Sequence, residues 1–168
     1  RSRDENGTST GSNHNYLTFP RAMSSVSIKM DVKFEHNKDL AKYQFFLNGQ
    51  YMKGNTPTTM TCGEISFEYD LSRTWLRYRK GNNTIAESVL VLPKTGEWME
   101  LEFRIDVPTQ SHDIYIDGEK YNEHSIPFYY ANSTVAGEEA KRTCIGINGI
   151  YYSSFRTSKN SAIYTDNV

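Results

Sequence analysis

Apolar and polar residues alternate with a period of two along most of this chain. In residues 26–34 every second side chain is apolar, and the residues between them are polar. Residues 97–107 repeat the pattern. One face is predicted to carry Met99, Leu101, Phe103 and Ile105, and the opposite face Trp98, Glu100, Glu102 and Arg104. Alternation of this kind predicts a β-strand that is buried on one face and open to a ligand or to water on the other.

Further strands are predicted at residues 43–51, 65–69, 74–80, 88–92, 112–116, 119–121, 143–152 and 162–168. The dipeptide Asp117-Gly118 between two of them indicates a tight hairpin, because both turn residues must tolerate positive φ. Only residues 134–141 have a composition that suits a helical turn. About ten strands joined by short polar turns predict an all-β fold, an antiparallel β-sandwich.

The chain divides into two parts by composition. Residues 1–15 are rich in Ser, Asn and Gly and are predicted to form a flexible N-terminal arm. Residues 16–168 are predicted to form a single β-sandwich domain. Because the sequence starts at Arg1 without a signal peptide, we expect it to be a mature or excised piece of a larger protein.

Charge and composition exclude some partners. The formal net charge of the 168 residues is -1, which gives no electrostatic attraction to nucleic acid. No run of about 18 apolar residues is present, so no membrane insertion is expected. Aromatic residues make up 13% of the chain, mostly Tyr, which suits strands and hydrated ligand-facing surfaces. Asn-x-Ser/Thr sequons at Asn6, Asn82 and Asn132 agree with an extracellular, secreted location.

Cys62 and Cys144 are the only cysteines. Two buried free thiols and one disulfide are both compatible with the sequence, and two cysteines alone do not make a zinc site.

Two segments resemble known sandwich families. The segment TGEWMELEFRID at 95–106, followed by IYIDGEK at 114–120, resembles the paired central strands of laminin-G-like and concanavalin-A-like domains. The segment INGIYYSSF at 147–155, followed by SAIYTDNV at 161–168, resembles the C-terminal end of jelly-roll polysaccharide lyases that cleave alginate and glucuronan. The resemblance implies a concanavalin-A-like jelly roll. The chain departs from the lyase pattern at residues 156–159, where RTSK replaces two glycines.

Sugar binding is the function that we expect from these features. Pyranose rings stack on exposed aromatic rings, while planar polar side chains hydrogen-bond the hydroxyls. Trp75 and Trp98 fall on the polar faces of their strands and are predicted to form one groove floor with neighbouring charged residues. The full set of predicted ligand-binding residues is Trp75, Arg77, Arg79, Trp98, Glu100 and Tyr151. The alternative is that loops cover this face and that Trp98 belongs to the core.

An enzymatic alternative is a polysaccharide lyase that cleaves a uronate polymer by β-elimination. This reaction needs a group that neutralises the substrate carboxylate, together with a base and an acid. Residues of the required types are Arg77, Arg79, His36, His112, Tyr151 and Tyr152. In the plainer interpretation, Arg77 and Arg79 pair across strands with Glu100 and Glu102, and His112 and His124 are exposed loop residues.

Two further expectations complete the picture. A laminin-G-like adhesion domain that binds a protein is a third functional hypothesis. Asp166, with Asp4 or Glu5, offers hard oxygen ligands for a structural calcium ion. The sequence leaves open which glycan is bound and which oligomer the chain forms.

Overall fold

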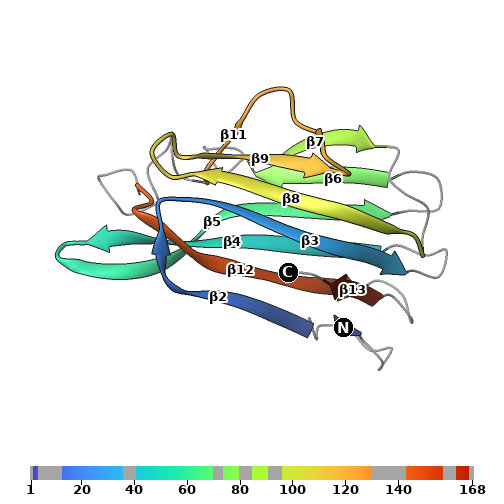
Figure 1. Ribbon diagram of the computed structural model, residues 1–168, viewed down its shortest axis with the longest axis horizontal. Coiled ribbons are helices and arrows are strands. Elements are labelled where there is room, and N and C mark those ends of the chain that lie inside the picture. The colour runs from blue at the N-terminus through green and yellow to red at the C-terminus, as the bar shows by residue number, and fades with distance from the viewer. Residues whose placement is uncertain are drawn as a thin grey trace.

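The computed structural model describes residues 2–3, 13–35, 41–69, 74–79, 85–90, 96–129, 143–156 and 162–166. These residues form two antiparallel sheets that stack face to face (Figure 1). Sheet A consists of β1 (Ser2–Arg3), β3 (Ser25–Glu35), β8 (Trp98–Asp106), β9 (Ser111–Ile116), β10 (Glu119–Lys120), β11 (Ile126–Pro127) and β13 (Ala162–Asp166). Sheet B consists of β2 (Asn13–Met23), β4 (Ala41–Lys53), β5 (Thr56–Tyr69), β6 (Thr74–Arg79), β7 (Ile85–Leu90) and β12 (Gly146–Arg156). The predicted all-β antiparallel sandwich is confirmed.

Strand order in both sheets differs from chain order. Sheet A runs β1-β13-β3-β8-β9-β10, with β11 also paired to β9, and sheet B runs β2-β12-β4-β5-β6-β7. The chain therefore crosses between the sheets several times, which places the C-terminal β12 and β13 beside strands from the N-terminal part. The hairpin of β4 and β5 extends past the other strands on the left of Figure 1.

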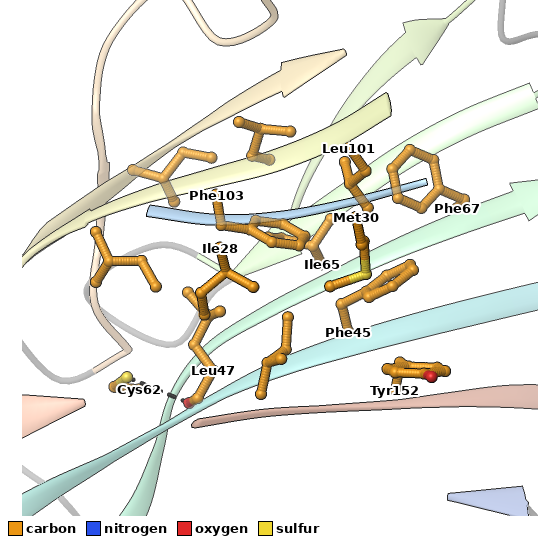
Figure 2. Close-up of a cluster of buried hydrophobic side chains, with 14 of the residues drawn as sticks. Ile28, Met30, Phe45, Leu47, Cys62, Ile65, Phe67, Leu101, Phe103 and Tyr152 are labelled. Carbon is orange, nitrogen blue, oxygen red and sulfur yellow. Dashed lines mark hydrogen bonds between the residues drawn. The ribbon is translucent and has the colours of Figure 1, made fainter. Parts of the chain in front are cut away.

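The apolar positions of the two sheets meet in one core. Met30 and Phe103 project from sheet A toward Phe45 and Ile65 of sheet B, and none of these four side chains is exposed (Figure 2). The rings of Phe45 and Phe103 touch across the sheets, with centroids 5.8 Å apart. Burying an aromatic or aliphatic side chain of this size contributes on the order of 2 kcal/mol, so the alternating pattern is what holds the layers together.

The predicted elements agree with the structure where the alternation is regular. Residues 26–34 lie in β3 and residues 97–107 contain β8. The hairpin forms as predicted, with φ of 50° at Asp117 and 81° at Gly118. β5 begins before the predicted segment 65–69. Its first half, TPTTMTC, is rich in Thr and lacks a regular alternation of apolar and polar residues, so the sequence pattern did not indicate it.

Two short parts of the segment predicted as an arm form strands, and residues 4–12 lie outside the described residues. Residues 2–3 pair with β13 as β1, and β2 begins at Asn13 and pairs with β12. β2 was not predicted, because it contains Pro20, which counts against a strand. The strand forms because β2 lies at the edge of sheet B, where a proline is tolerated. The predicted helical turn at 134–141 lies outside the described residues. Within the described part, no helix is long and apolar enough to cross a membrane.

Candidate functional site on two outer faces

The predicted ligand-binding residues are divided between the two sheets. Trp98 and Glu100 lie in β8, with Asp166 on β13 of the same sheet A, whereas β6 and β12 of sheet B hold the others: Trp75, Arg77, Arg79 and Tyr151. The prediction of one groove floor containing both tryptophans is therefore wrong. The outer faces of two stacked sheets point in opposite directions, so outward residues of β6 and β8 cannot share a surface.

The predicted pairing of arginines with glutamates is also wrong. Arg77 lies opposite Ser66 of β5 and Glu87 of β7, and Glu102 lies opposite Lys29 of β3 and Tyr115 of β9. The sequence pattern indicates which residues of one strand share a face, but it did not reveal which strands are neighbours.

Trp98, Glu100 and Asp166 meet at one pocket on sheet A. This Trp98 pocket has a volume of about 460 Å³ and is lined by Asp31, Trp98, Met99, Glu100, Asp117 and Asp166. Three of the seven residues predicted from the sequence, counting the metal candidate Asp166, are thus brought together. A volume of this order is typical of small-molecule and sugar sites.

Strand register explains why carboxylates from distant parts of the sequence gather here. Asp31 of β3 lies directly opposite Glu100 of β8 on one side and opposite Asp166 of β13 on the other. Asp117 joins them from the hairpin turn, since its Oδ1 accepts a hydrogen bond of 2.8 Å from the Glu100 N–H. The Asp117 N–H in turn donates to the Glu100 carbonyl at 2.9 Å. The turn is therefore fixed to the edge of the pocket.

The indole of Trp98 forms an exposed wall of the pocket. The residue is 52% exposed, so the alternative that Trp98 is a core residue is wrong. Lys33 lies directly opposite Trp98 in β3, and its Nζ lies over the indole, 5.5 Å from the ring centroid. The same Nζ lies 4.6 Å from the Tyr164 ring and 3.1 Å from a Glu35 carboxylate oxygen. The lysine is thus held beside the indole by several contacts.

Acidic side chains predominate in the lining of the pocket. Four carboxylates line it, and one of them, Glu100, forms an ion pair of 2.9 Å with Lys29, which raises the pKa of Lys29. Among the described residues no group of three or more His, Cys, Asp or Glu side chains is arranged to hold a metal ion. Asp4 and Glu5 lie outside the described residues, so the calcium site with Asp166 stays a prediction.

A second group of charged residues lies on the same face of sheet A, next to the pocket. Glu102, which is only 5% exposed, accepts hydrogen bonds from Arg104 at 2.9 and 3.0 Å and from the Ser27 hydroxyl at 2.5 Å. The bonds from Arg104 are the main reason that the pKa of Glu102 is lowered to about 2. The Arg104 guanidinium also lies over the Tyr115 ring, 3.8 Å from its centroid.

The outer face of sheet B carries a stack of aromatic rings. Tyr151 of β12 packs against Phe46 of β4, with ring centroids 4.4 Å apart and planes 9° apart. On its other side Tyr151 packs against Tyr16 of β2 at 5.5 Å. Burial raises the pKa of Tyr151. Both ring faces of Tyr151 are therefore occupied by protein, and only Tyr16, which is 67% exposed, presents a large ring area.

Polar side chains beside this stack bond mainly to one another. Gln44 donates to Glu64 at 2.8 Å, and the Tyr129 hydroxyl donates to the other oxygen of Glu64. Glu68 is bound by Lys42 at 3.0 Å and by Arg77 at 2.9 Å. The backbones of Trp75 and Arg79 belong to β6, but their side chains lie outside the described residues.

Two of the candidates for a lyase base, His112 and Tyr152, are buried. His112 is 2% exposed, because it lies with Ile114 on the inner face of β9. The prediction that His112 is an exposed loop residue is therefore wrong. Burial lowers the pKa of His112 to about 4. Tyr152 also points into the core, and its hydroxyl contacts the Thr165 hydroxyl at 2.7 Å. His124 is exposed as predicted, and His36 lies outside the described residues.

Sequence reasoning missed Asp31 and Asp117. Asp31 was visible as an outward position of an alternating strand, and Asp117 was interpreted only as a turn residue. Asp31 meets Glu100 and Asp166 through the β13-β3-β8 register, and Asp117 meets Glu100 through a hydrogen bond from the Glu100 N–H. Both depend on contacts between segments that are apart in the chain.

Comparisons with known proteins identify the fold. No protein-family model and no curated protein matches the sequence. A sialidase structure matches 90% of this chain with a TM-score of 0.55 and 12% identity, and the chain spans only 13% of the length of that protein. A tetrameric galectin from the ball sponge Cinachyrella sp. matches 92% of this chain and 96% of its own, with a TM-score of 0.52 and 9% identity. The chain therefore has the concanavalin-A-like jelly-roll fold that its sequence resembles.

Proposed function

We propose that this chain binds carbohydrate in the Trp98 pocket. The observation that carries the proposal is the half-exposed indole of Trp98, which walls a pocket of about 460 Å³ together with four carboxylates. An indole face binds the apolar C–H face of a pyranose, and carboxylate oxygens accept hydrogen bonds from its hydroxyls. Both requirements of sugar recognition are met by neighbouring residues of one surface.

The acidic lining of the Trp98 pocket limits the class of sugar that it can bind. The described residues that line the pocket include four carboxylates and no lysine or arginine. A uronate brought against Asp31, Glu100, Asp117 and Asp166 would be repelled, because like charges at close range are costly. The pocket therefore favours neutral hexoses or amino sugars over alginate and glucuronan.

The described residues give no support to the lyase alternative. Arg77 already binds Glu68 in an ion pair of 2.9 Å, and His112 is buried away from any substrate. Tyr151 lies between two rings, and its pKa is raised, whereas a base would need a lowered value.

The fold is compatible with carbohydrate binding but does not by itself support it, because the same architecture hosts many functions. We also propose that the chain acts outside the cell as a module of a larger protein. The sialidase match, of which this chain spans 13%, supports the idea of such a module.

A glycan array that displays neutral, amino and uronate glycans tests the proposal. The proteins to compare are the wild type, Trp98→Ala and Tyr16→Ala. Tyr16 is the matched control, because it is an exposed aromatic residue on the opposite sheet. We expect wild type and Tyr16→Ala to bind the same neutral or amino glycans and Trp98→Ala to lose them.

Other results contradict the proposal in distinguishable ways. Loss of binding in Tyr16→Ala with retention in Trp98→Ala would move the sugar site to sheet B. Binding of uronate polymers with release of ultraviolet-absorbing unsaturated products would establish the lyase instead. If the wild-type protein binds no glycan on the array, protein adhesion becomes the better hypothesis.

A further inference from the structure

The only two cysteines of the chain meet in the core although they are far apart in the sequence. Cys62 lies in β5 and Cys144 lies just before β12, and the two residues are 0% and 1% exposed. A Cβ atom added to Gly49 of β4 would lie 3.3 Å from the Cys62 sulfur and 2.6 Å from the Cys144 sulfur. Both sulfur atoms therefore border the same small space over Gly49.

The thiols are free in this structure and bond to nearby carbonyl groups. The Cys62 thiol donates to the Leu47 carbonyl at 3.2 Å, the bond drawn as a dashed line in Figure 2. The Cys144 thiol donates to the Gly146 carbonyl at 3.3 Å. These are weak hydrogen bonds, so they oppose rotation of the side chains only slightly.

Independent contacts fix the backbone at Cys144. The Gln110 side chain accepts from the Cys144 N–H at 2.8 Å and donates to the Cys144 carbonyl at 2.8 Å. The next residue, Ile145, donates its N–H to the Gln50 carbonyl at 2.7 Å. Cys144 is thus held in place by β4 and by the turn before β9.

The backbone at Cys62 is fixed as well. Leu47 pairs with Gly63 and Asn48 pairs with Thr61, so Cys62 is the extra residue of a β-bulge. Its carbonyl accepts a hydrogen bond of 2.9 Å from the Tyr129 N–H. The bulge directs the Cys62 side chain inward, toward the position that Cys144 occupies.

We propose that Cys62 and Cys144 form an intramolecular disulfide when the chain folds in an oxidising environment. Both sulfurs lie against the same position over Gly49, and hydrogen bonds hold the backbone at each cysteine, so the folded chain brings the two thiols together. A disulfide at this point joins β5 of sheet B to the segment that leads into β12. It also links the two ends of the segment between Tyr129 and Thr143. The Cys62 carbonyl accepts a hydrogen bond from the Tyr129 N–H at one end, and Cys144 directly follows Thr143 at the other.

Disulfide exchange with a small disulfide such as oxidised glutathione supplies the oxidant. The thiolate of one cysteine attacks a glutathione sulfur and breaks the glutathione S–S bond, releasing one glutathione thiolate. The thiolate of the second cysteine then attacks the protein sulfur of the mixed disulfide and releases the second glutathione. The protein loses two protons and two electrons, and one oxidised glutathione becomes two reduced ones.

The two thiols differ in pKa in the folded protein. Burial raises the pKa of Cys62, whereas the contact with the Cys62 side chain lowers the pKa of Cys144. Both sulfurs are inaccessible in the folded protein, so exchange takes place while the chain folds.

The test is refolding of the full chain from urea in a glutathione redox buffer, in parallel with refolding in excess reductant. Each product is then unfolded in the presence of a thiol alkylating reagent and weighed by mass spectrometry. We expect the oxidised product to be monomeric, to take up no alkyl groups and to weigh two hydrogens less than the reduced chain. We also expect its urea midpoint of unfolding to lie above that of the reduced protein.

The double variant Cys62→Ala/Cys144→Ala is the control, because its midpoint should be the same in both buffers. Two alkyl groups on the wild type after oxidative refolding would overturn the proposal. Disulfide-linked dimers, or cysteines that stop at the glutathione adduct, would overturn it equally. The comparison of oxidised and reduced wild type needs no variant, so poor folding of the alanine variant leaves the test intact.

Discussion

Asp31 lies directly opposite Glu100 in the β3-β8 ladder, and on its other side it lies opposite Asp166 of β13. Like charges at facing positions of a sheet are destabilising, by roughly 0.2–1 kcal/mol per pair. The facing carboxylates therefore lower the stability that the other contacts of these residues provide. We attribute this row of carboxylates to ligand binding.

The first prediction concerns this conflict between stability and binding. Asp31→Asn removes the facing like charges but keeps the shape and a hydrogen-bond acceptor. We expect the free energy of unfolding to rise by roughly 0.5 kcal/mol in a urea titration, while glycan affinity falls. Ser25→Ala, at the start of the same strand, is the control and should leave glycan affinity unchanged. A lower free energy of unfolding in Asp31→Asn than in the wild type would show that the Asp31 carboxylate stabilises the fold, and would contradict this prediction.

The second prediction concerns acid sensitivity through His112. Burial lowers the pKa of His112 to about 4, against 6.5 for the free side chain. As pH falls from 6.5 to 4, the unfolded chain takes up a proton that the folded chain excludes, so stability falls with pH. At about 1.4 kcal/mol per pKa unit, the loss reaches on the order of 3 kcal/mol by pH 4.

Leucine at this position removes the titrating group and keeps a similar volume. We expect His112→Leu to unfold at nearly constant free energy between pH 6.5 and pH 4, apart from the slope due to other groups. His124→Leu is the control, since His124 is exposed and its loss should leave the slope unchanged. If wild type and His112→Leu lose stability in parallel over this range, His112 does not titrate as the structure requires.

The third prediction concerns Glu102. Because its pKa is lowered to about 2 from 4.5, Glu102 stabilises the fold above pH 4.5, and this contribution disappears as pH falls through 2. Glu102→Gln weakens the bonds from Arg104 and Ser27, and we expect it to cost roughly 1–3 kcal/mol at pH 7. The difference between the two proteins should shrink below pH 4.5 in acid unfolding curves. A constant difference down to pH 2 would exclude the proposed cause.

The fourth prediction concerns Gly49. A Cβ at this position would lie 2.6 Å from the Cys144 sulfur and 3.0 Å from the Gly146 carbonyl oxygen, so Gly49→Ala forces core atoms apart. We expect a loss of roughly 1–3 kcal/mol in the free energy of unfolding. Thr59→Ala, on the exposed part of the neighbouring strand, should change stability little. Wild-type stability in Gly49→Ala would show that the two sulfurs are not where the structure has them.

The sequence was sufficient for the layers of the fold but not for the composition of the site. Alternation in residues 26–34 and 97–107 predicts which side chains enter the core, because the period of a strand is a local property. The pairing of β3 with both β8 and β13 depends on packing between distant segments, which a single sequence does not display. For this reason Trp75 and Trp98 were assigned to one groove although they belong to different sheets.

Buried polar residues were the other source of error. His112 looked like a loop residue because it follows a polar stretch and precedes a hairpin. In the structure it occupies an inward position of β9, near Gly63 and stacked with Phe128. Residue type alone could not reveal that a histidine replaces an apolar side chain there.

Titration calorimetry of a neutral or amino oligosaccharide into wild-type protein and into Trp98→Ala tests the central claim most directly. Removing an aromatic anchor from a binding site typically costs at least about 2 kcal/mol, which corresponds to about 30-fold in affinity. We predict a loss of that size for Trp98→Ala and unchanged affinity for Tyr16→Ala, with both variants folded. Equal affinity of Trp98→Ala and wild type would contradict the account.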